Sequence, residues 1–520
     1  MVVGDIVRNN ARNFPNKTGI VSNGKKFTWS ETDKRSNSIA NALLKLGLKK
    51  QEGVGILAQN GNEWVETAFA VAKAGLRLVP LNMAFVGREL SYIINNAKIK
   101  TLFVENSKAS LINDIRFELK DVEHIVGIGE KHGFFLDYEE MIKSNSAKDP
   151  EVHVSPDDIF LLPYTSGTTG QAKGAMLTHA NNIAEALCAS LEFRLLPHYT
   201  ALTALPLYFI GGWGGSALPA LIRGCTHIFM SFEPEQLLKT IQNEKVNYTL
   251  LVPTMINMIT NHPDVAKYDY SSLKVIPFAG SPLPVQFWIK AAKTFGNIFQ
   301  SIYGLTEVCA TITVLQPEEV HPEGDEKQQQ RLASIGKPMI GSSARVVDED
   351  MNDVKPGSDQ VGEIVLRGNT VMKGYWKDPE TTKETFRGGW LHTGDLARVD
   401  EDGNIYITDR QKDMIISGGK NVYPREIEEV LYKHPAVLDA CVIGIPDDKW
   451  GETVKAVVVL REGHSTTSEE IIEFCKQNLA SYKKPTSVDM VQALPRTSSG
   501  KILKRALREQ YWKGRDSKLV

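Results

Sequence analysis

The stretch from Tyr164 to Gly174, YTSGTTGQAKG, concentrates glycines, hydroxyl side chains and one lysine in a short segment. Glycine allows the backbone conformations in which successive N–H groups point at one anion, and hydroxyl and ammonium groups add further donors. This composition predicts a phosphate-binding loop, and the alternative is a flexible surface loop. The residues expected to contact phosphate are Thr165, Ser166, Gly167, Thr168, Thr169, Gly170 and Lys173.

The same stretch departs from the phosphate-binding loop of P-loop NTPases. That motif ends in Gly-Lys followed by Ser or Thr, whose hydroxyl binds magnesium. Here Ala172 precedes Lys173 and Gly174 follows it. The P-loop interpretation therefore fails, and other residues must identify the reaction.

Four further short motifs could supply chemistry, and each alone is a weak signal. In chain order they are Tyr303-Gly304-Leu305-Thr306-Glu307, Thr393-Gly394-Asp395, Asp409-Arg410 and Ser499-Gly500-Lys501. Together with the glycine-rich stretch, they resemble the motifs of the adenylate-forming superfamily of acyl-CoA synthetases, luciferases and peptide-synthetase adenylation domains. The resemblance extends from about residue 164 to 505.

The resemblance implies two half-reactions on a large N-terminal domain and a small, mobile C-terminal domain. A carboxylate first attacks the α-phosphate of ATP, which gives acyl-AMP and pyrophosphate. A thiol, usually that of coenzyme A, then displaces AMP. The implied cofactors and co-substrates are ATP, Mg²⁺ and coenzyme A.

The resemblance also assigns roles to the nucleotide-binding residues. Glu307 matches the magnesium ligand, and a hard cation that bridges phosphates prefers carboxylate oxygen. Thr306 matches a catalytic contact to the α-phosphate. Asp395 matches the acceptor of both ribose hydroxyls, and Arg410 matches a second ribose or phosphate contact. The residues expected along the adenine and its surroundings are Gly280, Ser281, Pro282, Ser301, Ile302, Tyr303 and Gly304.

Lys501 resembles the catalytic lysine, whose charge would offset the repulsion between carboxylate and α-phosphate. Lys412 occupies the position of the hinge between the two domains. Lys504, Arg505 and Arg508 are interpreted as a solvated helical face. The residues that match the coenzyme A side are Ser417, Gly418, Gly419, Lys420 and Trp450.

The stretch Leu205–Gly212 matches a family motif that lines the acyl pocket. Phe209 stands where many members have His, which favours an apolar acyl tail. The glycines at 211, 212, 214 and 215 are expected to leave empty volume, with Trp213 as wall or gate. The predicted pocket residues are Phe209, Gly211, Trp213, Phe278, Gly280, Ile302 and Val308, although ordinary core positions are an open alternative for the last several.

The resemblance therefore implies an ATP-dependent carboxylic acid–CoA ligase. A medium- or long-chain fatty acid is the expected substrate, and an aromatic or alicyclic acid is the alternative. A luciferase-like oxidase is disfavoured because the pocket histidine is missing. A non-catalytic nucleotide-binding protein is disfavoured because Thr306, Glu307, Asp395 and Lys501 are intact.

The elements around these motifs predict an α/β fold. Apolar runs at 246–252, 273–278 and 297–302 read as strands that end in small-residue loops, where ligand sites of α/β sheets lie. A helix is expected over Pro234–Glu244, and alternating residues from Gly362 predict a β-rich subdomain. We expect a large domain over 1–411 and a small α+β domain over 412–520. The latter begins with a helix at Pro424 and continues with strands at 440–445 and 455–460.

Composition narrows the remaining choices. The chain has 520 residues, 42% hydrophobic content and a formal net charge of -2, so a nucleic-acid partner is not expected. Its five cysteines include no CxxC pair, which indicates a reducing compartment and a cytoplasmic location. The charge-free stretch Leu195–Ile222 contains three prolines and is interpreted as buried, not membrane-spanning. A homodimer remains possible.

Overall fold

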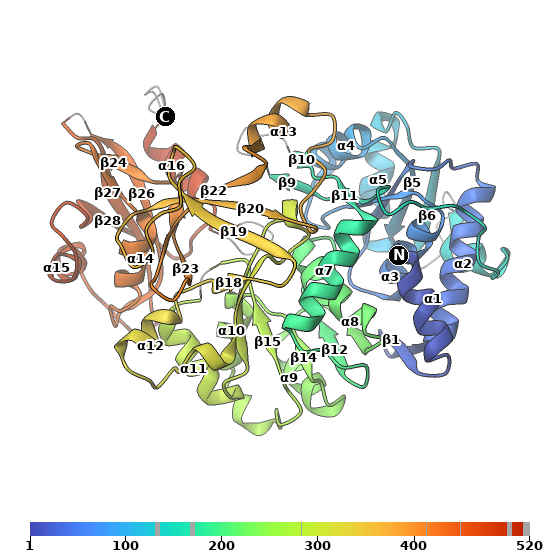
Figure 1. Cartoon of the computed structure of the whole chain (residues 1–520), viewed down its shortest axis with the longest axis horizontal. Helices are drawn as coiled ribbons and strands as arrows, with labels where there is room; N and C mark the ends of the chain where they lie inside the picture. The colour runs from blue at the N-terminus through green and yellow to red at the C-terminus, as the bar shows by residue number, and fades with distance from the viewer. Residues whose placement is uncertain are drawn as a thin grey trace.

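The computed structural model of the chain describes residues 1–129, 136–166, 172–281, 283–411, 413–447, 449–496 and 502–512. These residues form a large N-terminal domain and a small C-terminal domain, and both mix helices with strands (Figure 1). The α/β fold class predicted from the sequence is therefore confirmed. The small domain, drawn in orange to red, lies at one end of the molecule.

Two sheets of mostly parallel strands form the N-terminal part. One has the order β11 (Leu177–Thr178), β8 (Ile159–Leu161), β4 (Arg77–Pro80), β3 (Gly53–Leu57), β5 (Ile99–Glu105), β6 (His124–Ile128), β7 (Leu136–Asp137). The other has the order β14 (Tyr248–Thr249), β12 (Thr200–Thr203), β13 (Thr226–Phe229), β1 (Thr18–Ser22), β2 (Lys25–Thr28).

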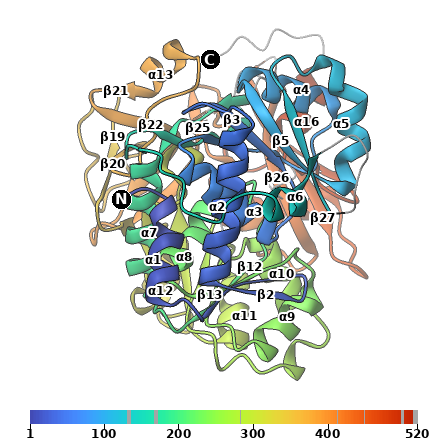
Figure 2. The ribbon, with the colours of Figure 1, turned by 90° about the vertical axis from the view of Figure 1, so that its right-hand side faces the viewer.

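Helices cover these sheets, and α1 (Gly4–Asn13) lies beside α2 (Trp29–Lys45), which packs on α3 (Asn62–Lys73) (Figure 2). Thr28 and Glu31 cap the start of α2 reciprocally, which satisfies backbone donors that the helix leaves free. The other helices of the large domain are α4 (Gly87–Asn96), α5 (Ala109–Ile115), α6 (Tyr138–Lys143), α7 (His179–Glu192), α8 (Leu218–Ile222), α9 (Pro234–Asn243), α10 (Pro253–Thr260), α11 (Val285–Phe295), α12 (Glu326–Arg331) and α13 (Pro379–Thr385).

Two further sheets carry the second half of the large domain. A four-stranded sheet has the order β15 (Ile276–Phe278), β16 (Phe299–Tyr303), β17 (Thr313–Leu315), β18 (Lys337–Pro338). An antiparallel sheet contains β19 (Ser342–Val347), β20 (Gly362–Gly368), β22 (Trp390–Val399) and β21 (Phe386–Arg387), with β23 (Ile405–Arg410) on β22. This sheet includes the β-rich region expected from Gly362 onward, but its first strand, β19, precedes that position.

The small domain is one sheet with helices against it. Its strands are β24 (Ile415–Ser417), β25 (Lys420–Val422), β26 (Val437–Asp447), β27 (Gly451–Leu460) and β28 (Ser487–Met490). Its helices are α14 (Pro424–Leu431), α15 (Ser468–Asn478) and α16 (Lys504–Trp512). As predicted, α14 starts at Pro424 and buries Ile427, Val430 and Leu431.

The predicted strand at 246–252 is shorter than expected, since β14 covers Tyr248–Thr249 and a single bridge pairs Leu251 with Phe278. The charge-free stretch forms β12, a π-helical turn over Gly211–Ala217 and α8. Across the described ranges, no helix combines the length and apolarity needed to cross a membrane.

Candidate active site

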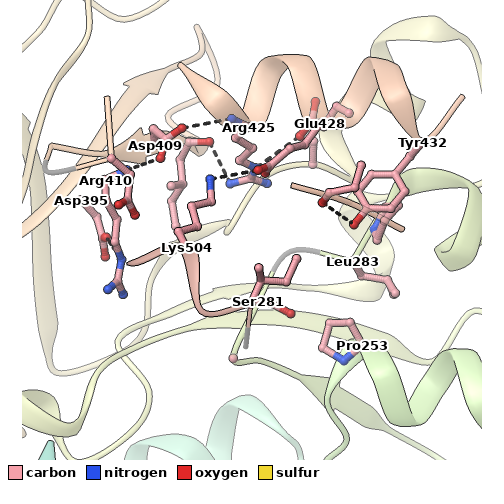
Figure 3. Close-up of a pocket in the computed structure, with 18 of the residues that line it drawn as sticks. Pro253, Ser281, Leu283, Asp395, Asp409, Arg410, Arg425, Glu428, Tyr432 and Lys504 are labelled. Atoms are coloured by element: carbon pink, nitrogen blue, oxygen red, sulfur yellow. Dashed lines mark hydrogen bonds and ion pairs between the residues drawn. The ribbon is translucent and has the colours of Figure 1, made fainter. Parts of the chain in front are cut away.

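A cavity of about 2090 Å³ lies between the two domains. In Figure 3, Pro253, Ser281 and Leu283 of the large domain face Glu428 and Lys504 of the small domain across it. The predicted site residues that line it are Phe278, Gly280, Ser281, Ser301, Ile302, Tyr303, Gly304, Asp395, Arg410 and Trp450. Residues that the sequence separates by more than a hundred positions therefore meet around one space.

The floor of the cavity is built by two neighbouring strand ends. Strands β15 and β16 run parallel, with Phe278 opposite Ser301, so the loops that follow them open at the same edge of the sheet. Gly280 has a φ of +93°, which favours glycine. A Cβ atom on Gly304 would lie 1.6 Å from the carbonyl oxygen of Ala310, so backbone contact excludes any side chain there.

A hydrogen-bonded group at Asp395 forms the predicted ribose site. Asp395 on β22 lies opposite Arg410 on β23, and the Arg410 Nε atom is 3.1 Å from Asp395 Oδ1. The Tyr303 hydroxyl donates to Asp395 Oδ2 over 2.6 Å. A carboxylate has about four lone-pair sites, so Asp395 keeps acceptor capacity for a ligand.

Charge around Asp395 is balanced by Arg410. Burial acts to lower the pKa of Arg410, but the neighbouring charges of Asp395 and Asp413 outweigh it and raise the pKa. Burial, together with the Asp395 charge, raises the pKa of Tyr303 well above its ordinary value. Tyr303 is therefore a neutral donor and Arg410 a fixed cation at this end of the cavity.

Glu307 and Lys173 are joined by a residue that sequence reasoning missed, Tyr375. The Tyr375 hydroxyl donates to Glu307 Oε1 over 2.8 Å, and the Lys173 Nζ atom lies 5.8 Å from the centre of the Tyr375 ring. Lys173 also donates to Thr381 Oγ1 over 2.6 Å and lies 3.3 Å from an Asp378 oxygen. No sequence motif indicated Tyr375 as a site residue, because its partners are distant in sequence.

The predicted magnesium ligand, Glu307, fits a particular kind of metal site. Mg²⁺ is usually held by one or two carboxylates together with substrate phosphates and water. Glu307 is one such carboxylate, and the described part of the chain has no cluster of three or more His, Cys, Asp or Glu side chains suited to a metal. The donor set fits a cation that arrives with a nucleotide.

The glycine-rich stretch is described only at its two ends. Thr165 on β9 (Tyr164–Ser166) pairs with Lys173 on β10 (Ala172–Gly174), so a hairpin places both residues at its base. Four predicted site residues of this stretch lie outside the described residues, namely Gly167, Thr168, Thr169 and Gly170. Three predicted residues elsewhere also lie outside them, namely Pro282, Lys412 and Lys501.

The predicted coenzyme A residues cluster on the small domain. Gly418 and Gly419 turn the chain between β24 and β25 with φ of +57° and +75°. The Gly418 N–H donates to the Trp450 carbonyl over 2.8 Å, and a Cβ atom on Gly418 would lie 2.6 Å from the Trp450 ring. Lys420 Nζ lies 4.7 Å from the centre of the Tyr482 ring. Trp450 is half exposed and lines the cavity, so it is not a core residue.

The expected solvated face on α16 needs correction. Lys504 lies 2.9 Å from Glu428, and Arg508 lies 3.2 Å from Glu452. Arg505 alone of the three is largely exposed, in a pair with Glu509 on its own helix. Lys504 and Arg508 thus pair with carboxylates of other elements, and all three residues line the cavity between the domains.

Of the residues predicted for the acyl pocket, Phe278, Gly280 and Ile302 line the cavity, whereas Trp213 is not among its lining residues. Trp213 is fully buried among Trp64, Phe69 and Phe160, with ring centres 5.1 to 6.4 Å apart. Val308 is fully buried in the same core. Trp213 is therefore a core residue and not a gate, because aromatic rings enclose it on several sides.

The glycines around Trp213 also differ from expectation. A Cβ atom on Gly212 would lie 2.1 Å from the Pro206 carbonyl oxygen, and one on Gly214 would lie 2.0 Å from that of Cys309. These two glycines permit close backbone packing and leave no empty volume. Gly211 is the exception, since a Cβ atom there would meet nothing within 4 Å. Phe209 is half-buried beside Tyr208.

Two family models match this chain. One described as AMP-binding enzyme covers residues 7–376, and one described as AMP-binding enzyme C-terminal domain covers residues 426–501. The chain therefore belongs to the AMP-binding, adenylate-forming family of enzymes. It is an AMP-forming acid–CoA ligase by class, which confirms the resemblance read from its motifs.

Individual relatives match over almost the whole chain. Feruloyl-CoA synthase of an Amycolatopsis species is 36% identical over 96% of this chain and 97% of its own. The medium/long-chain-fatty-acid–CoA ligase FadD8 of Mycobacterium tuberculosis is 34% identical over 96% of this chain and 88% of its own.

MatB from Rhodopseudomonas palustris is a structural neighbour in two states. The ATP-bound crystal structure has a TM-score of 0.89 at 29% identity, and the apo structure has 0.78 at 30% identity. Each alignment covers 99% of both chains.

Proposed function

We propose that this protein converts a carboxylic acid, ATP and coenzyme A into an acyl-CoA thioester, AMP and pyrophosphate. The observation that carries the proposal is the meeting of Tyr303, Asp395 and Arg410 with the loops after β15 and β16 in one cavity. The cavity thus presents hydrogen-bond donors, hydrogen-bond acceptors and a fixed cation, which are the groups needed to bind a nucleoside monophosphate.

In the first half-reaction, a carboxylate oxygen forms a bond to the α-phosphorus while the bond to the pyrophosphate oxygen breaks. Asp395 accepts from the ribose hydroxyls, and Lys173 holds the departing phosphates. Glu307 would hold Mg²⁺, which neutralises phosphate charge when bound. Lys501 bridges carboxylate and α-phosphate, and Thr306 contacts the α-phosphate.

In the second half-reaction, the sulfur of coenzyme A bonds to the acyl carbon and the bond to the AMP oxygen breaks. The thiol proton is lost, and AMP leaves as the phosphate monoester. Gly418, Gly419 and Trp450 would line the approach of the pantetheine arm, because the two glycines present bare backbone. We place the domain boundary at residues 411/412, with Lys412 as the hinge.

The domain arrangement described here suits the first half-reaction. The structure agrees more closely with ATP-bound MatB, at a TM-score of 0.89, than with apo MatB, at 0.78. Arg496 and Ile502, which flank the segment that contains Lys501, line the cavity. We infer that the small domain is oriented for acyl-AMP formation, the step assigned to Lys501.

The acid is apolar in this proposal. Phe278 and Ile302 line the cavity, Phe209 is half-buried, and Gly211 borders open space. An aryl-substituted acid is the first candidate, because feruloyl-CoA synthase is a full-length relative. A medium- or long-chain fatty acid is the second candidate, because FadD8 is another. All five cysteines are free thiols, which supports a cytoplasmic enzyme.

A panel of acids tests this function. Arylpropenoic, benzoic, medium-chain and long-chain acids are each assayed for pyrophosphate release, with and without coenzyme A, and for thioester by mass spectrometry. We expect pyrophosphate and thioester from at least one aromatic or fatty acid. No pyrophosphate from any acid would refute the ligase proposal, and light emission without thioester would favour an oxidase.

A further inference from the structure

Three charged side chains meet where the two domains join (Figure 3). Asp409 is the penultimate residue of β23 in the large domain, Glu428 belongs to α14, and Lys504 is the first residue of α16. The Lys504 Nζ atom lies 2.9 Å from Glu428 Oε1. Asp409 lines the same cavity as Lys504, and its charge, after that of Glu428, acts to raise the pKa of Lys504. One cation thus serves two carboxylates, one from each domain.

These groups are shielded from water, which makes their charges matter. The Lys504 and Glu428 side chains are 19% and 16% exposed, and Asp409 is 6% exposed. Burial acts to lower the pKa of Lys504, but Glu428 and Asp409 outweigh it and raise the pKa. Burial raises the pKa of Asp409, and the Lys504 charge opposes that rise. Removing the cation would leave two poorly hydrated carboxylates facing each other.

Backbone contacts fix the position of Asp409 against the small domain. Asp409 Oδ2 accepts a hydrogen bond from the Arg425 N–H over 3.0 Å, and the Arg425 guanidinium donates to the Ile407 carbonyl over 2.8 Å. Glu428 Oε1 also accepts from the Val442 N–H over 2.8 Å, which anchors it to β26. The carboxylates are therefore held in place and have little freedom to move apart if the cation is lost.

We propose that Lys504 is a positioning residue that holds the small domain in the orientation for acyl-AMP formation, by neutralising Asp409 across the domain boundary. The proposal rests on the proposed function. Lys504 and Glu428 share the small domain and stay together when it rotates, whereas Asp409 stays behind. The attraction to Asp409 therefore stabilises only the arrangement described here, and its loss shifts the equilibrium away from that arrangement.

The first test replaces Lys504 by Met, which keeps the length of the side chain and removes its charge. Acyl-AMP formation is measured by pyrophosphate release without coenzyme A, and thioester formation is measured from supplied acyl-AMP and coenzyme A. We expect Lys504→Met to slow the first step roughly tenfold or more, a range typical of coupling between conformational states, and to leave the second unchanged or faster.

Two further variants separate charge from packing. Lys504→Arg keeps the cation and should behave as the wild type. Adding Glu428→Gln to Lys504→Met removes one of the two facing carboxylates, so it should restore part of the acyl-AMP rate. The matched control is Lys476→Met, which makes the same substitution in an exposed ion pair with Glu473 on α15, away from the cavity lining, and should change neither step.

Several outcomes would overturn the positioning role. Equal loss of both steps in Lys504→Met would indicate a general structural role, and so would an equal effect of Lys476→Met. No recovery on adding Glu428→Gln would show that carboxylate repulsion is not the cause. If the Met variant does not fold, Lys504→Gln, which is neutral but still hydrogen-bonds, is judged by the same criteria. A wild-type protein inactive in both steps would instead refute the proposed function.

Discussion

The hydroxyl of Tyr303 donates a hydrogen bond to Asp395 over 2.6 Å, and this contact ties β16 of one sheet to β22 of another. Both residues line the cavity between the domains. The carboxylate is thus held in one orientation before any nucleotide arrives. Preorganisation of this kind lowers the cost of binding, because the group that receives the ligand is already ordered.

We therefore expect Tyr303→Phe to raise the KM for ATP roughly tenfold. A hydrogen bond to a charged group contributes about 1.5–3 kcal/mol, and about 1.4 kcal/mol is a factor of ten. The measurement is the KM for ATP in pyrophosphate release. Tyr511→Phe is the matched control, since it removes a Tyr–Asp hydrogen bond to Asp489 outside the cavity lining. Equal KM values for the two variants would contradict a role of Tyr303 at the ribose site.

Glu307→Gln should lower the rate of acyl-AMP formation about 100-fold and weaken its dependence on Mg²⁺, because a preorganised charge at the phosphates is lost. Tyr375→Phe keeps the ring beside Lys173 but removes the hydrogen bond to Glu307. It should raise the Mg²⁺ requirement roughly tenfold, as loss of a residue that orients a metal ligand does. The readout is the rate as a function of Mg²⁺ concentration.

The control for these two variants is Tyr92→Phe. The Tyr92 hydroxyl donates to the carbonyl of Ala172 over 3.1 Å, and Ala172 lies in the same hairpin as Lys173. This hydrogen bond does not involve Glu307. A wild-type Mg²⁺ response in Glu307→Gln would count against the metal-ligand assignment.

Gly211→Leu should change which acids are used. A side chain at this position enters open space, so we expect kcat/KM for bulky acids to fall roughly 10- to 200-fold relative to small ones. Gly214→Ala is the contrast, because its Cβ atom would clash with the Cys309 carbonyl and should lower stability instead. An unchanged ranking of acids in Gly211→Leu would remove Gly211 from the pocket.

Trp213→Ala should cost about 3–5 kcal/mol of the free energy of unfolding, because it opens a cavity in an aromatic core. The ranking of acids by relative kcat/KM should stay as in the wild type. Urea denaturation and the acid panel supply the two measurements. A shifted ranking with full stability would restore Trp213 as a pocket wall.

Lys501→Ala and Gly419→Leu should separate the two half-reactions. The first should abolish acyl-AMP formation yet still convert supplied acyl-AMP and coenzyme A to thioester. The second should do the reverse, because a side chain there blocks the pantetheine path. Each step is assayed separately, and loss of both steps in equal proportion in both variants would contradict alternating domain orientations.

The control for Gly419→Leu is Gly463→Leu. Both glycines have φ near +75° and open space around the position of a Cβ atom, and both lie in turns of the small domain. The backbone strain of the two substitutions is therefore matched. Loss of thioester formation in Gly463→Leu as well would attribute the effect to strain.

The amino-acid sequence by itself determined the features that depend on neighbouring residues. Apolar runs that end in small residues predicted β15, β16 and the loops at Gly280 and Gly304. Pro424 with Ile427, Val430 and Leu431 predicted α14, because helix initiation and a period of 3.6 residues are local properties. The order of short motifs indicated the family, since each motif keeps its own few residues together.

Only the tertiary structure decided what those segments contact. The sequence around Trp213 shows glycines and an aromatic ring but not what the ring packs against. In the structure the ring packs against Trp64 and Phe160, which makes it part of the core. Tyr375 reaches Glu307 across 68 residues, and Lys504 is part-buried because Asp409 and Glu428 approach it from two domains. A residue type states which contacts are favourable, whereas the path of the whole chain decides which partners are within reach, because burial and charge act through space.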